Sequence, residues 1–190
     1  MALTAIGLCS RALLKIGATA ITAFDEGSAE AELASALYGP ARDALLSANP
    51  WSFATLQATL PRLAAGPLAD YAHAYQLPLD FLRALGAGGA GRGRGLEYRI
   101  AGRTLQADGE TVVLTYIGRP AEEDFPPFFD QALIARLAAE FCIPLTENSS
   151  RAEALQRLAE QEFRRARMID GQQDSQPGFT DFTLIEARRR

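Results

Sequence analysis

The chain has 190 residues, 48% of them apolar, which suits one medium-sized domain whose core needs no metal or disulfide support. A formal net charge of −4 argues against a strongly basic nucleic-acid-binding protein, although it leaves room for a local basic patch. No apolar stretch reaches the roughly 18 residues needed to span a bilayer, and the N-terminus lacks the basic and apolar regions of a signal peptide, so we expect no membrane association.

The N-terminal part of the chain predicts two helices. The first covers Thr4–Ile16, with Gly17 placed to end it. The second begins at Ser28, whose hydroxyl can cap the free amides of the first turn, and ends at Asn49-Pro50. We expect Gly39-Pro40 to kink or briefly break this helix. Its expected buried face consists of Leu33, Leu37, Ala41, Ala44, Leu45 and Ala48.

The central part predicts a small antiparallel β region. Phe53–Thr59 alternates enough for a strand, with a helix as the alternative, and Asp80–Leu85 is a second possible strand. Gly86–Gly95, with the sequence GAGGAGRGRG, has the composition of a mobile loop. Leu96–Ile117 then predicts an antiparallel meander of consecutive strands.

Two further helices follow the β region. Pro126-Pro127 opens the third helix, and we expect Pro144 to end it. Ser150 and Glu153 form a capping box at the start of the fourth helix, which runs to Ile169. The expected buried positions are Phe129, Leu133, Leu137, Phe141 and Leu145 in the third helix, and Leu155, Leu158, Ala159, Phe163 and Ala166 in the fourth.

These elements predict a mainly α fold with a small antiparallel β region (α+β): a helical bundle with a projecting β-hairpin and an extended C-terminal arm. The bundle domain covers residues 1–170, the hairpin is inserted at about 80–118, and the arm covers residues 171–190. Cys9 and Cys142 lie far apart in apolar helical contexts, so we expect buried free thiols. The predicted core anchors are Trp51, Phe53, Leu45 and Phe141.

No catalytic or cofactor motif stands out. Gly86, Gly88 and Gly91 match G-x-G-x-x-G, but no helix is predicted to follow and receive a pyrophosphate, so we expect no dinucleotide cofactor. His73, the single histidine, is the one candidate for nucleophilic catalysis, and nothing links it to a particular serine or cysteine. One histidine and two separated cysteines give no metal-ligand spacing, and the acidic run Glu122–Asp124 is typical of a solvated helix start. We therefore predict no catalytic residue, no cofactor and no metal.

Four arginines in and after the glycine tract form a candidate basic patch. This pattern indicates either contact with nucleic-acid phosphates or a solvated loop that keeps a glycine tract soluble. Tyr98 and Tyr116 are the nearby aromatic residues that could stack on bases. The four residues are Arg92, Arg94, Arg99 and Arg103.

The C-terminal segment carries apolar side chains in a stretch too short to bury them by itself. Such a segment docks either on its own domain or on another chain. Its apolar residues are Phe179, Phe182, Leu184 and Ile185, and it closes with Arg188, Arg189 and Arg190.

Four segments, in their order along the chain, carry a resemblance to a known family. They are Ala41–Phe53 (ARDALLSANPWSF), Tyr75–Arg83 (YQLPLDFLR), the hairpin region from Tyr98 through Gly102 to Ile117, and the paired helices from Phe128 to Ile169. Over roughly residues 3 to 170, the chain resembles the head-to-tail adaptor (connector) proteins of tailed bacteriophages, the family of the tail tubular protein A and related head-completion proteins.

The resemblance implies a structural protein and not an enzyme. Such adaptors form a ring, commonly dodecameric, beneath the portal protein of the capsid, where they extend the DNA channel and attach the tail, stopper or nozzle protein. It implies that Phe179–Arg190 docks on the portal or a neighbouring subunit, and that the four arginines face the tail or the lumen. Double-stranded DNA would pass without sequence specificity, and the acidic balance of the chain would suit a channel that must not hold passing DNA tightly. The protein would be made in the cytoplasm of a bacterial host and reside at the head–tail junction of the virion.

Two other hypotheses remain. One is a small nucleic-acid-contacting module that uses the Gly/Arg loop, with Arg92, Arg94, Arg99 and Arg103 on phosphates. The other is an enzyme that uses His73, for which the sequence offers the least support.

Overall fold

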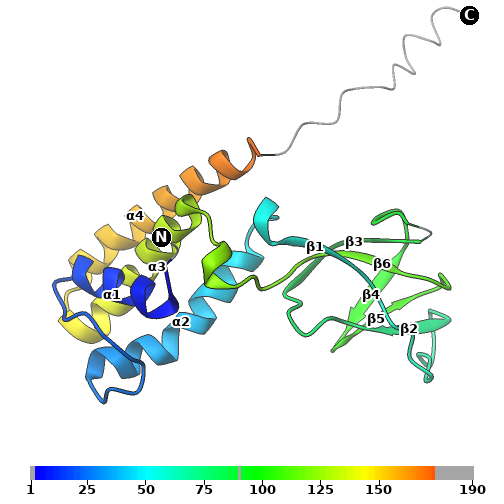
Figure 1. The fold of residues 1–190 in the computed structure, drawn as a ribbon, viewed down its shortest axis with the longest axis horizontal. Coiled ribbons are helices and arrows are strands. Elements are labelled where there is room, and N and C mark those ends of the chain that lie inside the picture. The colour runs from blue at the N-terminus through cyan, green and yellow to red at the C-terminus, as the bar shows by residue number, and fades with distance from the viewer. Residues whose placement is uncertain (1–2, 90, 174–190) are drawn as a thin grey trace, which may run out of the picture.

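The computed structural model describes residues 3–89 and 91–173, which form a helical bundle at one end and a β region at the other (Figure 1). Four α-helices and two small antiparallel sheets within these ranges confirm the predicted α+β fold class. The helices are α1 (Ala5–Lys15), α2 (Ala29–Ser47), α3 (Pro127–Thr146) and α4 (Ser149–Asp170), with short 3₁₀ turns at η1 (Ser52–Ala54) and η2 (Glu122–Asp124). The strands are β1 (Thr55–Thr59), β2 (His73–Gln76), β3 (Arg83–Gly88), β4 (Tyr98–Ala101), β5 (Thr104–Ala107) and β6 (Val113–Ile117).

Helix α3 is the centre of the bundle, because it packs against α1, α2 and α4. Four of its five predicted core positions, Phe129, Leu133, Leu137 and Phe141, have no exposed surface, and Leu145 is half-buried. Alanines and isoleucine on its other sides are buried as well, so the helix is apolar around nearly its whole circumference, as expected of a central helix.

Two prolines lie inside helices, whereas the helix before Asn49-Pro50 ends close to the predicted position. Helix α2 runs without interruption through Gly39-Pro40, so the expected short break is wrong: the proline removes one helical hydrogen bond, while Tyr38 and Ala41 beside it stay packed in the core. Helix α3 likewise continues past Pro144, and its final turn is supported by the hydrogen bond from the Thr146 hydroxyl to the Cys142 carbonyl (2.6 Å).

The caps of three helices are visible as side-chain hydrogen bonds. Ser28 caps α2 as predicted, because its Oγ accepts from the Ala31 amide at 3.2 Å. Thr4 caps α1 in the same way. The predicted Ser150 cap of α4 is wrong, since the Asn148 Oδ1 accepts from the Arg151 amide (2.9 Å) and Ser150 lies inside the helix. Asparagine caps helices as well as serine does, so a matching capping-box pattern two residues further on does not exclude it.

An aromatic cluster joins the bundle to the β region. Trp51 has no exposed surface and donates from Nε1 to the Leu45 carbonyl (3.0 Å), which satisfies an acceptor near the end of α2. Its ring lies within 5.3 to 6.5 Å of four phenylalanine rings, measured between centroids, two of them edge-on. The rings belong to Phe53, Phe128, Phe129 and Phe163, and Phe125 extends the group by contacts with Phe53 and Phe129.

A chain of charged groups ties α2 to the segment that returns from the β region. Tyr38 donates to Glu122 (2.9 Å), and Arg42 bridges Glu122 (3.1 Å) and Asp43 (2.9 Å). Arg119 adds two bonds to the Asp43 carboxylate, at 3.0 and 2.5 Å. Burial raises the pKa of the Asp43 and Glu122 carboxyls, but their hydrogen bonds outweigh it and leave both pKa values below the ordinary range. Burial, followed by the bond to Glu122, raises the pKa of Tyr38, so the phenol stays a neutral donor.

The six strands form two antiparallel sheets with the orders β1–β6–β3 and β2–β5–β4. The chain after β1 crosses to the second sheet, where Arg62 pairs with Tyr75 and the Leu63 amide donates to the Ala74 carbonyl (2.8 Å). At the other edge, the Leu96 amide donates to the Ala87 carbonyl (2.9 Å). Backbone hydrogen bonds therefore connect the sheets at both edges, and we call the resulting six-stranded unit the barrel. Its interior holds Leu60, Tyr75, Leu77, Ala87, Leu105, Ala107, Val112, Leu114 and Tyr116.

The pairing corrects part of the predicted meander. Strands β4 and β5 form the expected hairpin, but β6 leaves them and pairs with β1 and β3. Strand β1 lies within the predicted strand Phe53–Thr59, so the helical alternative there is wrong, and both β1 and β2 precede the hairpin insertion expected at about 80–118. The expected strand Asp80–Leu85 lies three residues further on, at Arg83–Gly88, and takes in the first residues of the predicted mobile loop.

Asp170 should be a main stabilising contact between α4 and the β region. This carboxylate is 3% exposed and accepts from the Ser52 amide (3.1 Å to each oxygen) and the Ser52 hydroxyl (2.7 Å). Asp170→Ala leaves the Ser52 amide without its partner, so we expect the free energy of unfolding to fall by about 1–3 kcal/mol. Chemical denaturation followed by Trp51 fluorescence measures it. Ser52→Ala removes only the hydroxyl bond and should cost less; equal losses would contradict this role of the carboxylate.

Asp130 should make the stability depend on pH. It is 8% exposed, its Oδ1 has no hydrogen-bond partner, and burial raises its pKa to about 6 although the charge of Arg11 opposes this. The ordinary value is about 3.9, so the folded state binds the extra proton between about pH 4 and 6, and stability falls as the pH rises through this window. We expect Asp130→Asn to flatten this part of the profile and to add up to about 3 kcal/mol at pH 7.

Thermal or urea unfolding between pH 4 and 7 tests this expectation. Asp124→Asn, at an exposed position, is the matched control and should follow the parent profile. An Asp130→Asn profile as steep as that of the parent would show that this carboxyl is not the titrating group.

Candidate interaction surfaces

The structure divides the four predicted arginines into two pairs. Arg99 forms an ion pair with Asp70 (2.7 Å) and lies over the Tyr71 ring at 5.5 Å, and Arg103 donates to the Pro78 carbonyl (2.8 Å). Both belong to the β2–β5–β4 side of the barrel. Arg92 and Arg94 lie on the loop after β3, and both side chains are exposed. The two pairs thus lie on different segments of the barrel, and Arg99 and Arg103 have partners within the protein.

The Gly/Arg loop, residues 91–95, is held against the outer face of the β1–β6–β3 sheet. Thr115 on β6 donates to the Gly93 carbonyl (3.0 Å), and Gln57 on β1 donates to the Thr115 hydroxyl (3.2 Å). A Cβ on Gly93 would overlap the Thr115 hydroxyl, and a Cβ on Gly88 would overlap the Arg92 carbonyl. The glycines thus permit close packing of the loop on the sheet, which differs from the expectation that the whole tract is mobile.

The loop and the sheet enclose a cleft of about 740 Å³. We call it the loop cleft. The described residues that line it include two guanidinium groups, one amide and one hydroxyl, and no carboxylate. Gln57 and Thr115 were not anticipated from the sequence, because nothing in the sequence shows that β1, β6 and the loop meet. The lining residues are Gln57, Leu85, Gly86, Arg92, Gly93, Arg94, Gly95 and Thr115.

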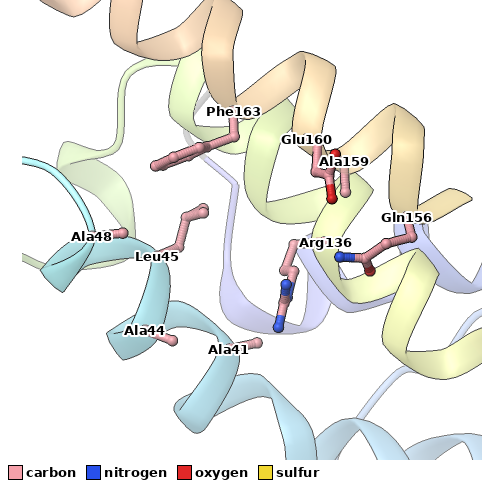
Figure 2. A pocket seen from close by; sticks show the side chains of 9 residues that line it. All are labelled: Ala41, Ala44, Leu45, Ala48, Arg136, Gln156, Ala159, Glu160 and Phe163. Atoms are coloured by element: carbon pink, nitrogen blue, oxygen red, sulfur yellow. The ribbon is translucent and has the colours of Figure 1, made fainter.

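A second concave surface, the bundle groove, lies between α2 and α4 (Figure 2). It has a volume of about 190 Å³ and is mainly apolar, with Arg136 of α3 pointing into it and Glu160 and Gln156 at one end. A 150 Å³ apolar cavity can take a benzene ring, so the groove has room for one large side chain. Its apolar lining is Ala41, Ala44, Leu45, Ala48, Ala159 and Phe163.

The groove explains where the predicted face of α2 was wrong. Ala41 and Leu45 are buried as expected, but Ala44 and Ala48 are exposed and line the groove. The core instead takes Ala31, Ala34 and Tyr38. A helix rich in alanine gives several nearly equal apolar faces, so periodicity alone does not choose between them.

The other candidate groups do not assemble into one site. His73 begins β2 in the barrel, whereas Cys9 and Cys142 are free thiols buried in the bundle. Burial raises the pKa of the Cys9 thiol to about 12, so it is an unreactive core residue. Within the described ranges, no three histidine, cysteine, aspartate or glutamate side chains gather closely enough to hold a metal ion.

The predicted docking residues of the C-terminal arm lie outside the described residues. These are Phe179, Phe182, Leu184, Ile185, Arg188, Arg189 and Arg190. Of the predicted core anchors, Trp51 and Phe141 are fully buried, Leu45 is 9% exposed and Phe53 is half-buried.

Comparison with known proteins leaves the family open. No protein-family model matches the chain, and no curated protein sequence matches it. Among the helices that the structure describes, none is both long and apolar enough to cross a bilayer.

Gly88→Ala should loosen the Gly/Arg loop. The new methyl group would overlap the Arg92 carbonyl and approach the Arg94 amide to 2.6 Å, both of them backbone atoms that a side-chain rotation cannot clear. We expect a loss of about 1–3 kcal/mol in the free energy of unfolding, as for overpacking elsewhere. Gly89→Ala, whose nearest contact would be an ordinary 3.4 Å, is the control from the same tract. Equal stability of the two variants in urea denaturation would refute the close packing.

Proposed function

We propose that this protein is a ring-forming head-to-tail adaptor of a tailed phage or a phage-derived particle. The observation that carries the proposal is the order of its parts over residues 3 to 170. A helix that ends in a Trp-containing segment, a β region and a pair of helices follow one another as they do in the adaptors that the sequence resembles. The described helices and strands are compatible with this order.

The bundle groove supports an assembling role. Ala44 and Ala48 leave an apolar hollow on the surface, beside a core already well filled by α3. Contiguous exposed apolar surface on a soluble protein commonly marks a contact with another protein. In the proposed ring, this hollow receives a side chain from a neighbouring subunit.

The polar and aromatic contacts between the bundle and the barrel also support an assembling role. Trp51 with its phenylalanines, the Asp170–Ser52 bonds and the Arg119–Asp43 pair fix the barrel to the bundle from several sides. A ring subunit needs a fixed orientation of its barrel relative to its bundle. An error in this orientation would be repeated in every subunit around the ring.

In this proposal, the partners are further copies of the chain, the portal protein above the ring and a tail, stopper or nozzle protein below it. The segment Phe179–Arg190 contacts the portal or the adjacent subunit, and double-stranded DNA passes through the lumen. The protein then resides at the head–tail junction of the virion and performs no catalysis.

Light scattering after size exclusion, followed by electron microscopy with the portal protein of the same particle, tests the proposal. We expect rings that sit coaxially on the portal. Removal of residues 174–190 should preserve the fold and weaken the portal contact. A chain that remains a monomer with the portal present, at concentrations where the portal itself forms rings, would overturn the proposal.

Ala44→Glu should weaken self-association. The side chain is exposed in the single chain, so the fold should tolerate the change, but the larger charged group would occupy the hollow and would have to be desolvated by a contact on the groove. We expect at least a tenfold loss in the association constant by light scattering or sedimentation. Ser35→Glu adds the same charge at another exposed position of α2, half a turn around the helix, and should leave association unchanged. Equal effects of the two variants would place the contact elsewhere.

A further inference from the structure

The loop cleft carries donors of the kind that hold phosphate groups. Arg92 and Arg94 supply two positive charges, and the Gln57 amide beside them has a second N–H besides the one it donates to Thr115. The Thr115 hydroxyl donates to the Gly93 carbonyl and holds the loop instead of facing a ligand as a donor. Arginine and glutamine are among the side chains that contact the nucleic-acid backbone. Among residues 3–89 and 91–173, no carboxylate lines the cleft to compete with an anion for the guanidinium groups.

We propose that the loop cleft binds the phosphate backbone of double-stranded DNA, through Arg92 and Arg94. The inference does not depend on the chain being an adaptor, because it concerns a site on one subunit.

Hydrogen bonds hold the backbone of the loop that carries Arg92 and Arg94, which distinguishes this site from two arginines on an unsupported surface segment. The Gly93 carbonyl between them accepts from Thr115, and the Arg92 amide donates to the Gly89 carbonyl (3.1 Å). The Leu96 amide then anchors the far side of the loop on Ala87 (2.9 Å). Because the backbone is already positioned, less conformational entropy is lost when the two side chains engage a ligand.

The same geometry explains why Arg99 and Arg103 are not part of this site. Arg99 is neutralised by Asp70 and stacked on Tyr71, and Arg103 is bound to the Pro78 carbonyl. These contacts hold each side chain in its place on the β2–β5–β4 side of the barrel. Both are therefore suitable controls, since they carry the same charge in the same barrel.

The aromatic residues favour duplex DNA over single strands. Binding of single strands relies on aromatic side chains that stack on unpaired bases. Tyr116 is 5% exposed and stacks on Phe81 at 6.0 Å between ring centroids, and Tyr98 packs against the barrel interior. No aromatic residue in the described part of the chain lines the loop cleft, so these residues can contact a charged backbone but offer no platform for bases.

Titration of a fluorescent duplex of about 30 base pairs with the full chain, followed by anisotropy over a range of salt concentrations, tests the proposal. Two phosphate contacts predict weak binding that is best measured at low salt, with a slope of log K against log salt of about −1.8. Binding should be the same for two unrelated duplex sequences and weaker for a single strand of equal length.

The double variant Arg92→Ala/Arg94→Ala should lose at least tenfold in affinity and nearly the whole salt slope. Arg99→Ala/Arg103→Ala should keep most of both, and Arg92→Lys/Arg94→Lys should keep the slope because the charge remains. Trp51 fluorescence verifies that each variant is folded. Equal losses in the two alanine pairs, no duplex binding by the parent chain, or tighter binding of the single strand would each overturn the inference.

The outcomes also separate this inference from the proposed function. A chain that binds duplex through Arg92 and Arg94 but forms no ring with a portal protein contradicts the adaptor proposal alone. A chain that forms rings whose DNA affinity is indifferent to both arginines contradicts the loop cleft alone.

Discussion

The structure depends on the packing of Trp51 at the junction of its two halves. The indole contacts rings from α3, α4 and the start of the β region, and its N–H satisfies a carbonyl near the end of α2. Edge-to-face aromatic pairs contribute about 0.5–1.5 kcal/mol each beyond the area they bury. One side chain therefore connects elements from residue 45 to residue 163, and it sets the direction in which the chain leaves the bundle.

Hydrogen bonds around the aromatic cluster fix the direction in which the chain leaves the bundle. Apolar packing alone tolerates small rotations, whereas hydrogen bonds to a buried carboxylate require particular positions of both partners. Asp170 holds the Ser52 amide and hydroxyl, and Asp43 holds Arg119 on the returning segment. The two connections between bundle and barrel are thus each fixed by a carboxylate from a helix. This arrangement lets a small barrel be carried as a rigid extension of the bundle.

The bundle groove and the loop cleft differ in chemistry. The bundle groove is apolar and small, which suits a side chain of another protein, and the loop cleft is cationic, which suits a backbone of phosphates. They lie on different halves of the molecule, so both can be used at once without competition. If both proposals hold, contacts between subunits come from the helical half and contacts with DNA come from the barrel.

The sequence by itself determined the helices, the hairpin of β4 and β5, and much of the core. Capping side chains such as Ser28 and the apolar stripe of Phe129, Leu133 and Phe141 act locally, so they are visible in a single chain. Tertiary structure alone decided that β6 joins β1 and β3, because pairing between distant strands depends on how both sheets close around one interior. It also decided which face of the alanine-rich α2 is buried, and it divided the four arginines by giving Arg99 and Arg103 partners far away in sequence. Local sequence patterns show which residues are apolar and which are charged. Only the folded chain determines which of them have partners within the protein and which lie on its surface.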